Sequence, residues 1–185
     1  MPHSTQCALP DDVLLHPLQR HDDQRGWLME GYRGTWFEGL PIARQWNITH
    51  SGVNTMRALH VHGIHHDYLT LITGELFLGL QDVRPWSASH GRACGLTLRA
   101  EEPVIVSIPP GVAHGFWFPH QPAMYLVGVS HYWAAEDELG CRWDDPDVRV
   151  SWPGAQNPIL SESDQQAGSY RRMQQDLLDL MGIKA

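Results

Sequence analysis

The chain has few cysteines, few basic residues and no long apolar run. Its three cysteines, Cys7, Cys94 and Cys141, are an odd number and widely spaced, which excludes a CxxC motif and a disulfide-rich secreted scaffold and suits a reducing cytoplasm. Only 13 Lys and Arg stand against 21 Asp and Glu, a formal net charge of -8, which excludes a nucleic acid as the main partner. No stretch is long and apolar enough to cross a bilayer, and the first residues do not have the pattern of a signal peptide. We therefore expect no membrane partner and no export.

The composition predicts an ordinary globular protein. Hydrophobic residues make up 42% of the 185 residues and charged residues 18%, which excludes a disordered chain. This length fits one domain, residues 1–185, and is too short for two independent enzyme domains. We expect its core over about residues 12–134 and a C-terminal loop and helix over residues 144–185.

Short runs of β-branched and aromatic residues, separated by Gly and Pro, predict an all-β sandwich or barrel. The predicted strands are Val13–Leu18, Trp27–Tyr32, Ile42–Thr49, Thr55–Val61, Tyr68–Thr73, Leu76–Gln81, Leu96–Ala100, Val104–Ile108, Gly115–Phe118 and Met124–Trp133. Tight turns are expected around Gly74 and Gly111. Only the tail has helical spacing of apolar residues, from Tyr170 to Met181, with Ser169 as N-cap and Gly182 just past the end.

Twelve histidines are present, and their spacing is more informative than their number. His60 and His62 lie two residues apart on a predicted strand, so their side chains share one face. Asp67 begins the next strand, and His114 follows a Pro-Pro-Gly turn. Three imidazoles and one carboxylate predict a site for Fe, Zn, Mn or Ni with open positions. An ion pair between Asp67 and Arg57 is the alternative.

These residues resemble the two motifs of the cupin superfamily. His60-x-His62, four residues, Asp67, six residues and Gly74 is similar to the first motif, with Asp in place of the usual Glu. Pro109-x-Gly111-x-x-His114 is similar to the second. The resemblance implies a double-stranded β-helix, the cupin jelly-roll barrel, with the C-terminal helix added to it.

A closer resemblance, from about Asp22 to Gly168, is to the dTDP-4-dehydrorhamnose 3,5-epimerase (RmlC) family. The matching segments are Arg25-Gly26-Trp27-Leu28-Met29-Glu30, Gln45-Trp46-Asn47, Met56-Arg57-Ala58-Leu59-His60, Ala113-His114-Gly115-Phe116, Cys141-Arg142-Trp143-Asp144-Asp145-Pro146, Ser151-Trp152-Pro153 and Leu160-Ser161-Glu162-Ser163-Asp164. The resemblance implies an epimerase of a nucleotide-activated 4-keto-6-deoxysugar, active as a homodimer without an organic cofactor.

The resemblance also implies roles for individual residues. His60 takes the place of the base that removes a proton next to the sugar ketone, and Asp164 that of the carboxylate that orients it. Arg57 and His114 would face the enolate or the diphosphate. The remaining substrate-binding positions are Arg25, Glu30, Gln45, Asn47 and Glu138.

Two family positions differ in this chain. The lysine that stabilises the enolate aligns with Asp67, and the proton-donating tyrosine aligns with Val127; Tyr125 lies two residues earlier, on the same strand face. A carboxylate beside a developing oxyanion reverses the sign of an interaction of about 4 kcal/mol. A divalent cation on His60, His62, Asp67 and His114 would compensate, but a metal-bound His60 could not act as the base.

Three functions therefore compete. The first is the sugar-nucleotide epimerase. The second is a metal-dependent cupin enzyme of other chemistry, an oxygenase or lyase, on the same scaffold. The third is a catalytically silent sugar-binding relative, which the presence of His60, Asp164 and Arg57 makes less attractive.

Overall fold

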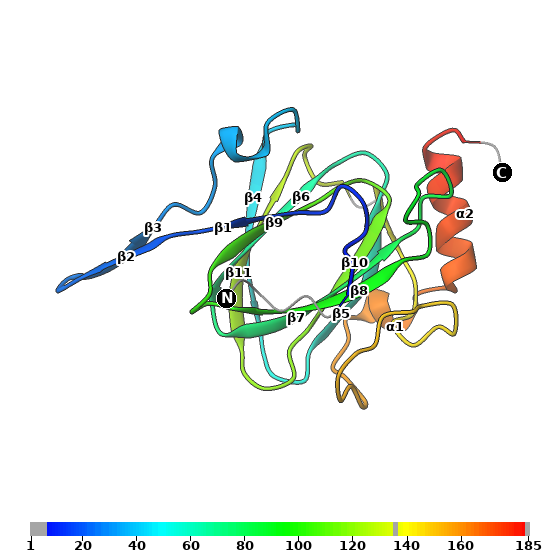
Figure 1. The fold of residues 1–185 in the computed structure, drawn as a ribbon. Coiled ribbons are helices and arrows are strands. Elements are labelled where there is room, and N and C mark those ends of the chain that lie inside the picture. The colour runs from blue at the N-terminus through cyan, green and yellow to red at the C-terminus, as the bar shows by residue number, and fades with distance from the viewer. Residues whose placement is uncertain (1–6, 135–136, 184–185) are drawn as a thin grey trace.

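Two antiparallel five-stranded sheets face each other in the computed structural model, which describes residues 7–134 and 137–183 (Figure 1). The first sheet has the order β1 (Leu14–Pro17), β9 (Val104–Ile108), β6 (Asp67–Thr73), β11 (Ala123–Val129) and β4 (Gln45–Ser51). The second has the order β12 (Glu138–Gly140), β5 (Met56–His62), β10 (Val112–Trp117), β7 (Glu75–Asp82) and β8 (Ala93–Arg99). This arrangement confirms the predicted all-β jelly-roll barrel.

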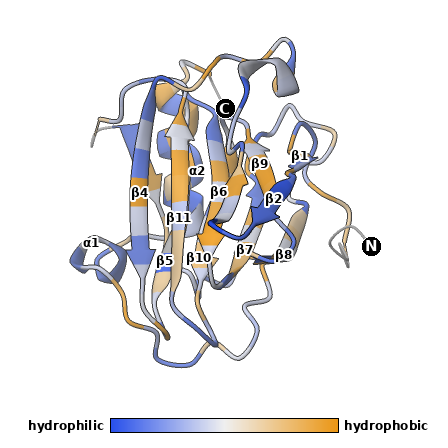
Figure 2. Ribbon diagram, turned by 90° about the vertical axis from the view of Figure 1, so that its left-hand side faces the viewer, coloured by the Kyte–Doolittle hydropathy of each residue, from blue (hydrophilic) through white to orange (hydrophobic). Residues whose placement is uncertain are grey.

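The core lies between the two sheets. Leu69 and Leu71 of β6 face Leu78 of β7 and Leu96 of β8 in one cluster of buried side chains. Buried and half-buried residues alternate along β8, because one of its faces packs against the core. Figure 2 shows apolar residues concentrated on β6, β9 and β11, whereas the edge strand β4 is mostly hydrophilic or neutral.

Every predicted strand has a counterpart, but two strands were not predicted, β2 (Arg20–Asp23) and β12. All four residues of β2 are exposed, so its sequence has no apolar alternation to detect. β2 pairs with β3 (Gly26–Met29) in a separate hairpin that projects away from the barrel (Figure 1). The last predicted strand is shorter than expected, because β11 ends at Val129.

Two glycines make the predicted tight turns. Gly74 separates β6 from β7 at φ +83°, and a Cβ there would lie 2.1 Å from the Pro122 carbonyl oxygen. Gly111 joins β9 to β10 at φ +78°. Both positions therefore need glycine, which adopts positive φ without steric cost.

Helix α2 (Tyr170–Leu180) covers the outer face of the second sheet (Figure 1). The Ser169 hydroxyl accepts a hydrogen bond from the Arg172 N–H, and Gly182 lies beyond the helix at φ +68°, as predicted. Met173 and Leu177 pack against Leu59. Two shorter helices, η1 (Gly34–Phe37) and α1 (Glu162–Gln165), were not predicted. No helix in the described ranges is long and apolar enough to cross a membrane.

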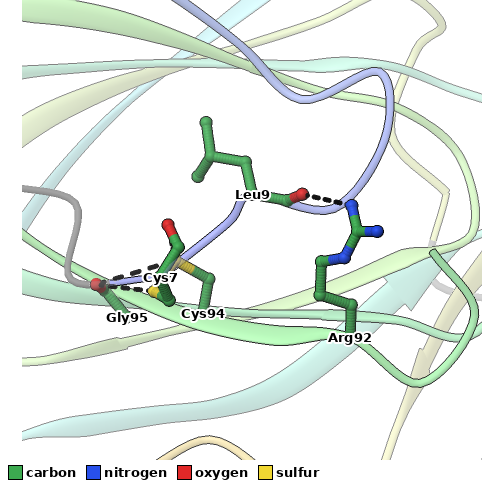
Figure 3. The surroundings of a disulfide bond; sticks show 5 residues. All are labelled: Cys7, Leu9, Arg92, Cys94 and Gly95. Carbon is green, nitrogen blue, oxygen red and sulfur yellow. Dashed lines mark hydrogen bonds between the residues drawn. A yellow bond between two sulfur atoms is a disulfide. The ribbon is translucent and has the colours of Figure 1, made fainter.

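A disulfide joins Cys7 to Cys94 of β8 across 87 residues of sequence (Figure 3). Beside it, the Arg92 guanidinium donates to the Leu9 carbonyl at 2.9 Å, so the N-terminal segment is held to the barrel at two points. The bond contradicts the expectation of three reduced cysteines and removes that argument for a cytoplasmic location. Cys141 is buried and free.

Candidate active site

A pocket of about 170 Å³ opens between the two sheets. The first sheet contributes residues from β4, β6 and β11, and the second contributes residues from β5, β10 and β12. Six of the predicted catalytic and substrate-binding residues line it: Asn47, Arg57, His60, His114, Tyr125 and Glu138. The barrel thus gathers most of the predicted site.

His60 is paired with a carboxylate from the far end of the chain. Its Nε2 lies 2.7 Å from Oδ1 of Asp164, which is buried. The short helix α1 fixes this carboxylate, because the Ser161 hydroxyl accepts a hydrogen bond from the Asp164 N–H at 3.1 Å. An ionised carboxylate only accepts hydrogen bonds, so the pair places the proton on Nε2 and leaves Nδ1 as the basic nitrogen.

A second carboxylate lies on the other side of the same imidazole. Oε1 of Glu138 is 3.3 Å from Nδ1 of His60, and the Trp133 indole N–H donates to Oε2 of Glu138 at 2.8 Å. Sequence reasoning placed Glu138 among the substrate-binding residues but missed this contact. Only the antiparallel pairing of β12 with β5 brings it here.

Asp67 lies among three histidines and joins the two sheets. Its Oδ2 is 3.3 Å from Nε2 of His114 and 3.5 Å from Nε2 of His62, and its Oδ1 is 3.5 Å from Nε2 of His65. One ligand atom from each of His62, Asp67 and His114 lies within 4.8 Å of the others. The rings of His62 and His65 are stacked.

Burial sets the ionisation of this group. It raises the pKa of the Asp67 carboxyl well above its ordinary value, and the charge of Glu138 adds to that shift. Burial also lowers the pKa of His62 well below its ordinary value and that of His114 to about 4. Both imidazoles are therefore neutral at pH 7, the form that binds a metal.

The predicted four-residue metal set is wrong in one member. His60 is outside the group formed by His62, Asp67 and His114, because its ring is held between Asp164 and Glu138. The alternative role for Asp67, an ion pair with Arg57, is also not observed. The Arg57 Nε instead donates to the Ser51 hydroxyl at 3.0 Å.

Tyr125 and Val127 both line the pocket, as expected for residues two apart on one strand. A register irregularity between Met124 and Tyr125 interrupts the pairing of β11 with β6. The Tyr125 side chain is buried, and its hydroxyl oxygen lies 3.5 Å from that of Ser51. Burial raises the pKa of Tyr125. Tyr125 therefore stays protonated and able to donate a proton. Ser51, which contacts both Tyr125 and Arg57, was not predicted.

Three predicted substrate-binding residues lie outside this pocket within one chain. Arg25 is on the projecting hairpin and forms an ion pair with Asp23 at 2.6 Å. Glu30 pairs with Arg33 just after the hairpin. Gln45 is closer, because its side-chain amide donates to that of Asn47 at 2.9 Å.

A family model described as dTDP-4-dehydrorhamnose 3,5-epimerase matches residues 6–172. The chain belongs to this family. The protein of that name from Pseudomonas aeruginosa is 33% identical over 173 residues, which cover 90% of this chain and 95% of that protein. The one from Salmonella typhimurium is 33% identical over 167 residues, covering 86% and 90%.

Solved structures of a dTDP-4-dehydrorhamnose 3,5-epimerase and of a dTDP-6-deoxy-D-glucose-3,5-epimerase, in that order, share the fold. The Elizabethkingia anophelis protein has a TM-score of 0.79 at 26% identity and covers 93% of this chain and 98% of its own. The Legionella pneumophila protein, solved in complex with dTDP-4-keto-L-rhamnose, has a TM-score of 0.84 at 23% identity, with 94% and 96% covered. The present family member shares this fold.

Proposed function

We propose that this protein is an epimerase of a nucleotide-activated 4-keto-6-deoxysugar, of the dTDP-sugar type. It removes a proton from a carbon next to the ketone and returns a proton to the opposite face. The pairing of His60, which lines the pocket, with the buried Asp164 carries the proposal. Family membership favours it over a metal-dependent oxygenase or lyase.

The neighbouring residues fit the steps of this reaction. Nδ1 of His60 takes the proton, and Asp164 stabilises the imidazolium that forms; a positioned base of this kind contributes about 10²- to 10⁴-fold in rate. The Glu138 carboxylate lies 3.3 Å from Nδ1 and would hold a proton there, so substrate has to displace Glu138 before Nδ1 can act as the base. Arg57 is the one Lys or Arg among the described residues that line this pocket, and it provides positive charge for the enolate or diphosphate.

Tyr125 is the candidate for returning the proton. Its hydroxyl is neutral, buried and in the same pocket as His60. A base and an acid held by different sheets let the proton leave from one face of the sugar and arrive at the other.

The projecting hairpin supports a homodimer as part of the proposal. Arg25 on the hairpin and Glu30 just after it are too exposed to complete a site within one chain. In a homodimer the hairpin brings these residues to the nucleotide in the partner's pocket.

The cytoplasmic location stays a prediction.

The test is incubation of the purified protein with dTDP-4-keto-6-deoxyglucose in heavy water. We expect a mass increase in the sugar, with deuterium at C3, at C5 or at both carbons. An unchanged sugar in the presence of folded, substrate-saturated protein would contradict the proposal.

A further inference from the structure

Two chemically different groups share the pocket. The first is His60 with its two carboxylates, and the second is the cluster of His62, Asp67 and His114, with His65 behind it. His60 contacts its two carboxylates and is not one of the three clustered ligands. A base and a cation site can therefore lie side by side in the pocket.

We infer that His62 Nε2, Asp67 Oδ2 and His114 Nε2 form a binding site for one divalent first-row transition cation. Two imidazoles and one carboxylate are a common ligand set for such ions and leave positions open for substrate or water. The three residues come from β5, β6 and β10, so rigid strands of both sheets hold them.

The surroundings fit a cation better than they fit a hydrogen-bonded core. Contacts of 3.3 to 3.5 Å from Asp67 to the three histidines are longer than the usual N–H···O hydrogen bond. Neither ring nitrogen of the buried His65 has a hydrogen-bond partner among the described residues. Buried polar groups normally have partners, and a cation between His62, Asp67 and His114 would give one to the ligand atoms that face each other there.

Residues around the ligands have the arrangement expected of supporting groups. Nδ1 of His114 lies 3.3 Å from the Val112 carbonyl oxygen; donation from this nitrogen leaves the lone pair of Nε2 facing Asp67. Nε2 of His65 lies 3.5 Å from the other oxygen of Asp67. Such partners orient metal ligands and set their basicity.

The catalytic consequence rests on the proposed function, whereas the binding site does not. Asp67 occupies the position of the family's lysine, so a cation here restores the missing positive charge. When bound, it would supply Lewis-acid stabilisation of negative charge on a substrate oxygen. His60 remains free to take the proton.

Binding is tested on full-length protein purified without a histidine tag or nickel column, stripped with a chelator and titrated with Zn²⁺ or Co²⁺. We expect elemental analysis to give one ion per chain. The absorption spectrum of the Co²⁺ protein should be that of an ion bound by imidazole nitrogen and carboxylate oxygen. Asp67→Asn and His62→Gln remove ligands and should each weaken binding by more than the roughly 10- to 100-fold that loss of an outer supporting partner costs. The matched control His66→Gln changes a neighbouring histidine outside the cluster and should bind like the wild type.

Binding well below one ion per chain, or equal affinity in Asp67→Asn and wild type, would overturn the site. Circular dichroism of each variant separates lost binding from lost folding. Deuterium exchange into the sugar, measured with and without metal, separates the two proposals. Full exchange by the stripped protein would overturn the role of the cation while the epimerase stands. Stoichiometric binding without any exchange would overturn the epimerase, and with it the catalytic role of the cation, while the binding site stands.

Asp67→Lys provides a complementary readout. It should abolish cobalt binding and place a lysine ammonium where the resemblance expects one. Deuterium exchange should then become insensitive to chelator. Exchange by a folded Asp67→Lys protein that still required added metal would overturn the catalytic role.

Discussion

The Asp164 carboxylate lies 2.7 Å from Nε2 of His60, although 104 residues separate the two in sequence. The contact fixes one tautomer and one orientation of the imidazole. It also explains why His60 stays out of the neighbouring metal-ligand cluster: its ring is turned toward the C-terminal segment.

Asp164→Asn should lower the rate of deuterium exchange by about 10²- to 10⁴-fold and leave substrate affinity almost unchanged. An amide cannot stabilise the imidazolium and favours a different tautomer. Initial rates over a range of substrate concentrations measure this. Glu162→Gln is the matched control, because Glu162 is exposed on the same short helix. An equal loss in both variants would indicate disturbance of the helix instead.

Tyr125→Phe should separate the two halves of the reaction. Removing the hydroxyl leaves His60 in place, so loss of the substrate proton should continue while formation of the epimer falls by about 10-fold or more. Proton NMR of the sugar in heavy water follows both processes. Epimer formation at the wild-type rate would rule Tyr125 out as the proton donor.

Reduction of the disulfide should destabilise the protein. A crosslink between Cys7 and Cys94 restricts an 87-residue segment of the unfolded chain, and native disulfides contribute about 2 to 4 kcal/mol. Thermal unfolding with and without dithiothreitol measures the difference. Cys7→Ser should unfold at the temperature of the reduced wild-type protein, with or without dithiothreitol. A wild-type unfolding midpoint that reductant does not change would contradict the presence of the disulfide.

The buried histidines should make the metal-free protein less stable as the pH falls. The pKa of His114 is about 4 in the folded state and about 6.5 in an unfolded chain, so the unfolded state binds more protons between these values. Stability is therefore lost as the pH falls from about 6.5 to 4, by up to about 3 kcal/mol from His114 alone. The raised pKa of Asp67 acts in the opposite direction.

His114→Gln isolates this contribution, because Asp67 is present in both proteins. Chemical denaturation of metal-free samples at several pH values should show a flatter pH profile for the variant. Replacement of the exposed His50 by Gln serves as control and should leave the profile unchanged. Parallel profiles for His114→Gln and wild type would show that His114 does not titrate as described.

Local patterns in the sequence were enough to predict an all-β sandwich or barrel, and the family resemblance implied the jelly roll. Gly74 and Gly111 mark turns that only glycine can make closely, and the apolar runs between such turns became strands. The polar strand β2 had no such pattern. Family resemblance identified His60 and Asp164, because each lies in a motif that can be recognised by itself, although the two motifs are far apart in the chain.

Contacts between distant segments were not predictable in the same way. Alternation along β5 places His60 and His62 on one face, which suggested a shared metal. It does not reveal that β12 and α1 bring Glu138 and Asp164 to His60. The disulfide was missed for the same reason, since only the folded chain places Cys7 beside β8.

The most direct test of the central claim is deuterium exchange at the carbons next to the sugar ketone, compared between wild type and His60→Asn. The account predicts exchange by the wild-type protein and a loss of at least about 100-fold in the variant, with the fold and dTDP binding retained. Equal exchange rates in the two proteins would contradict the assignment of His60 as the base.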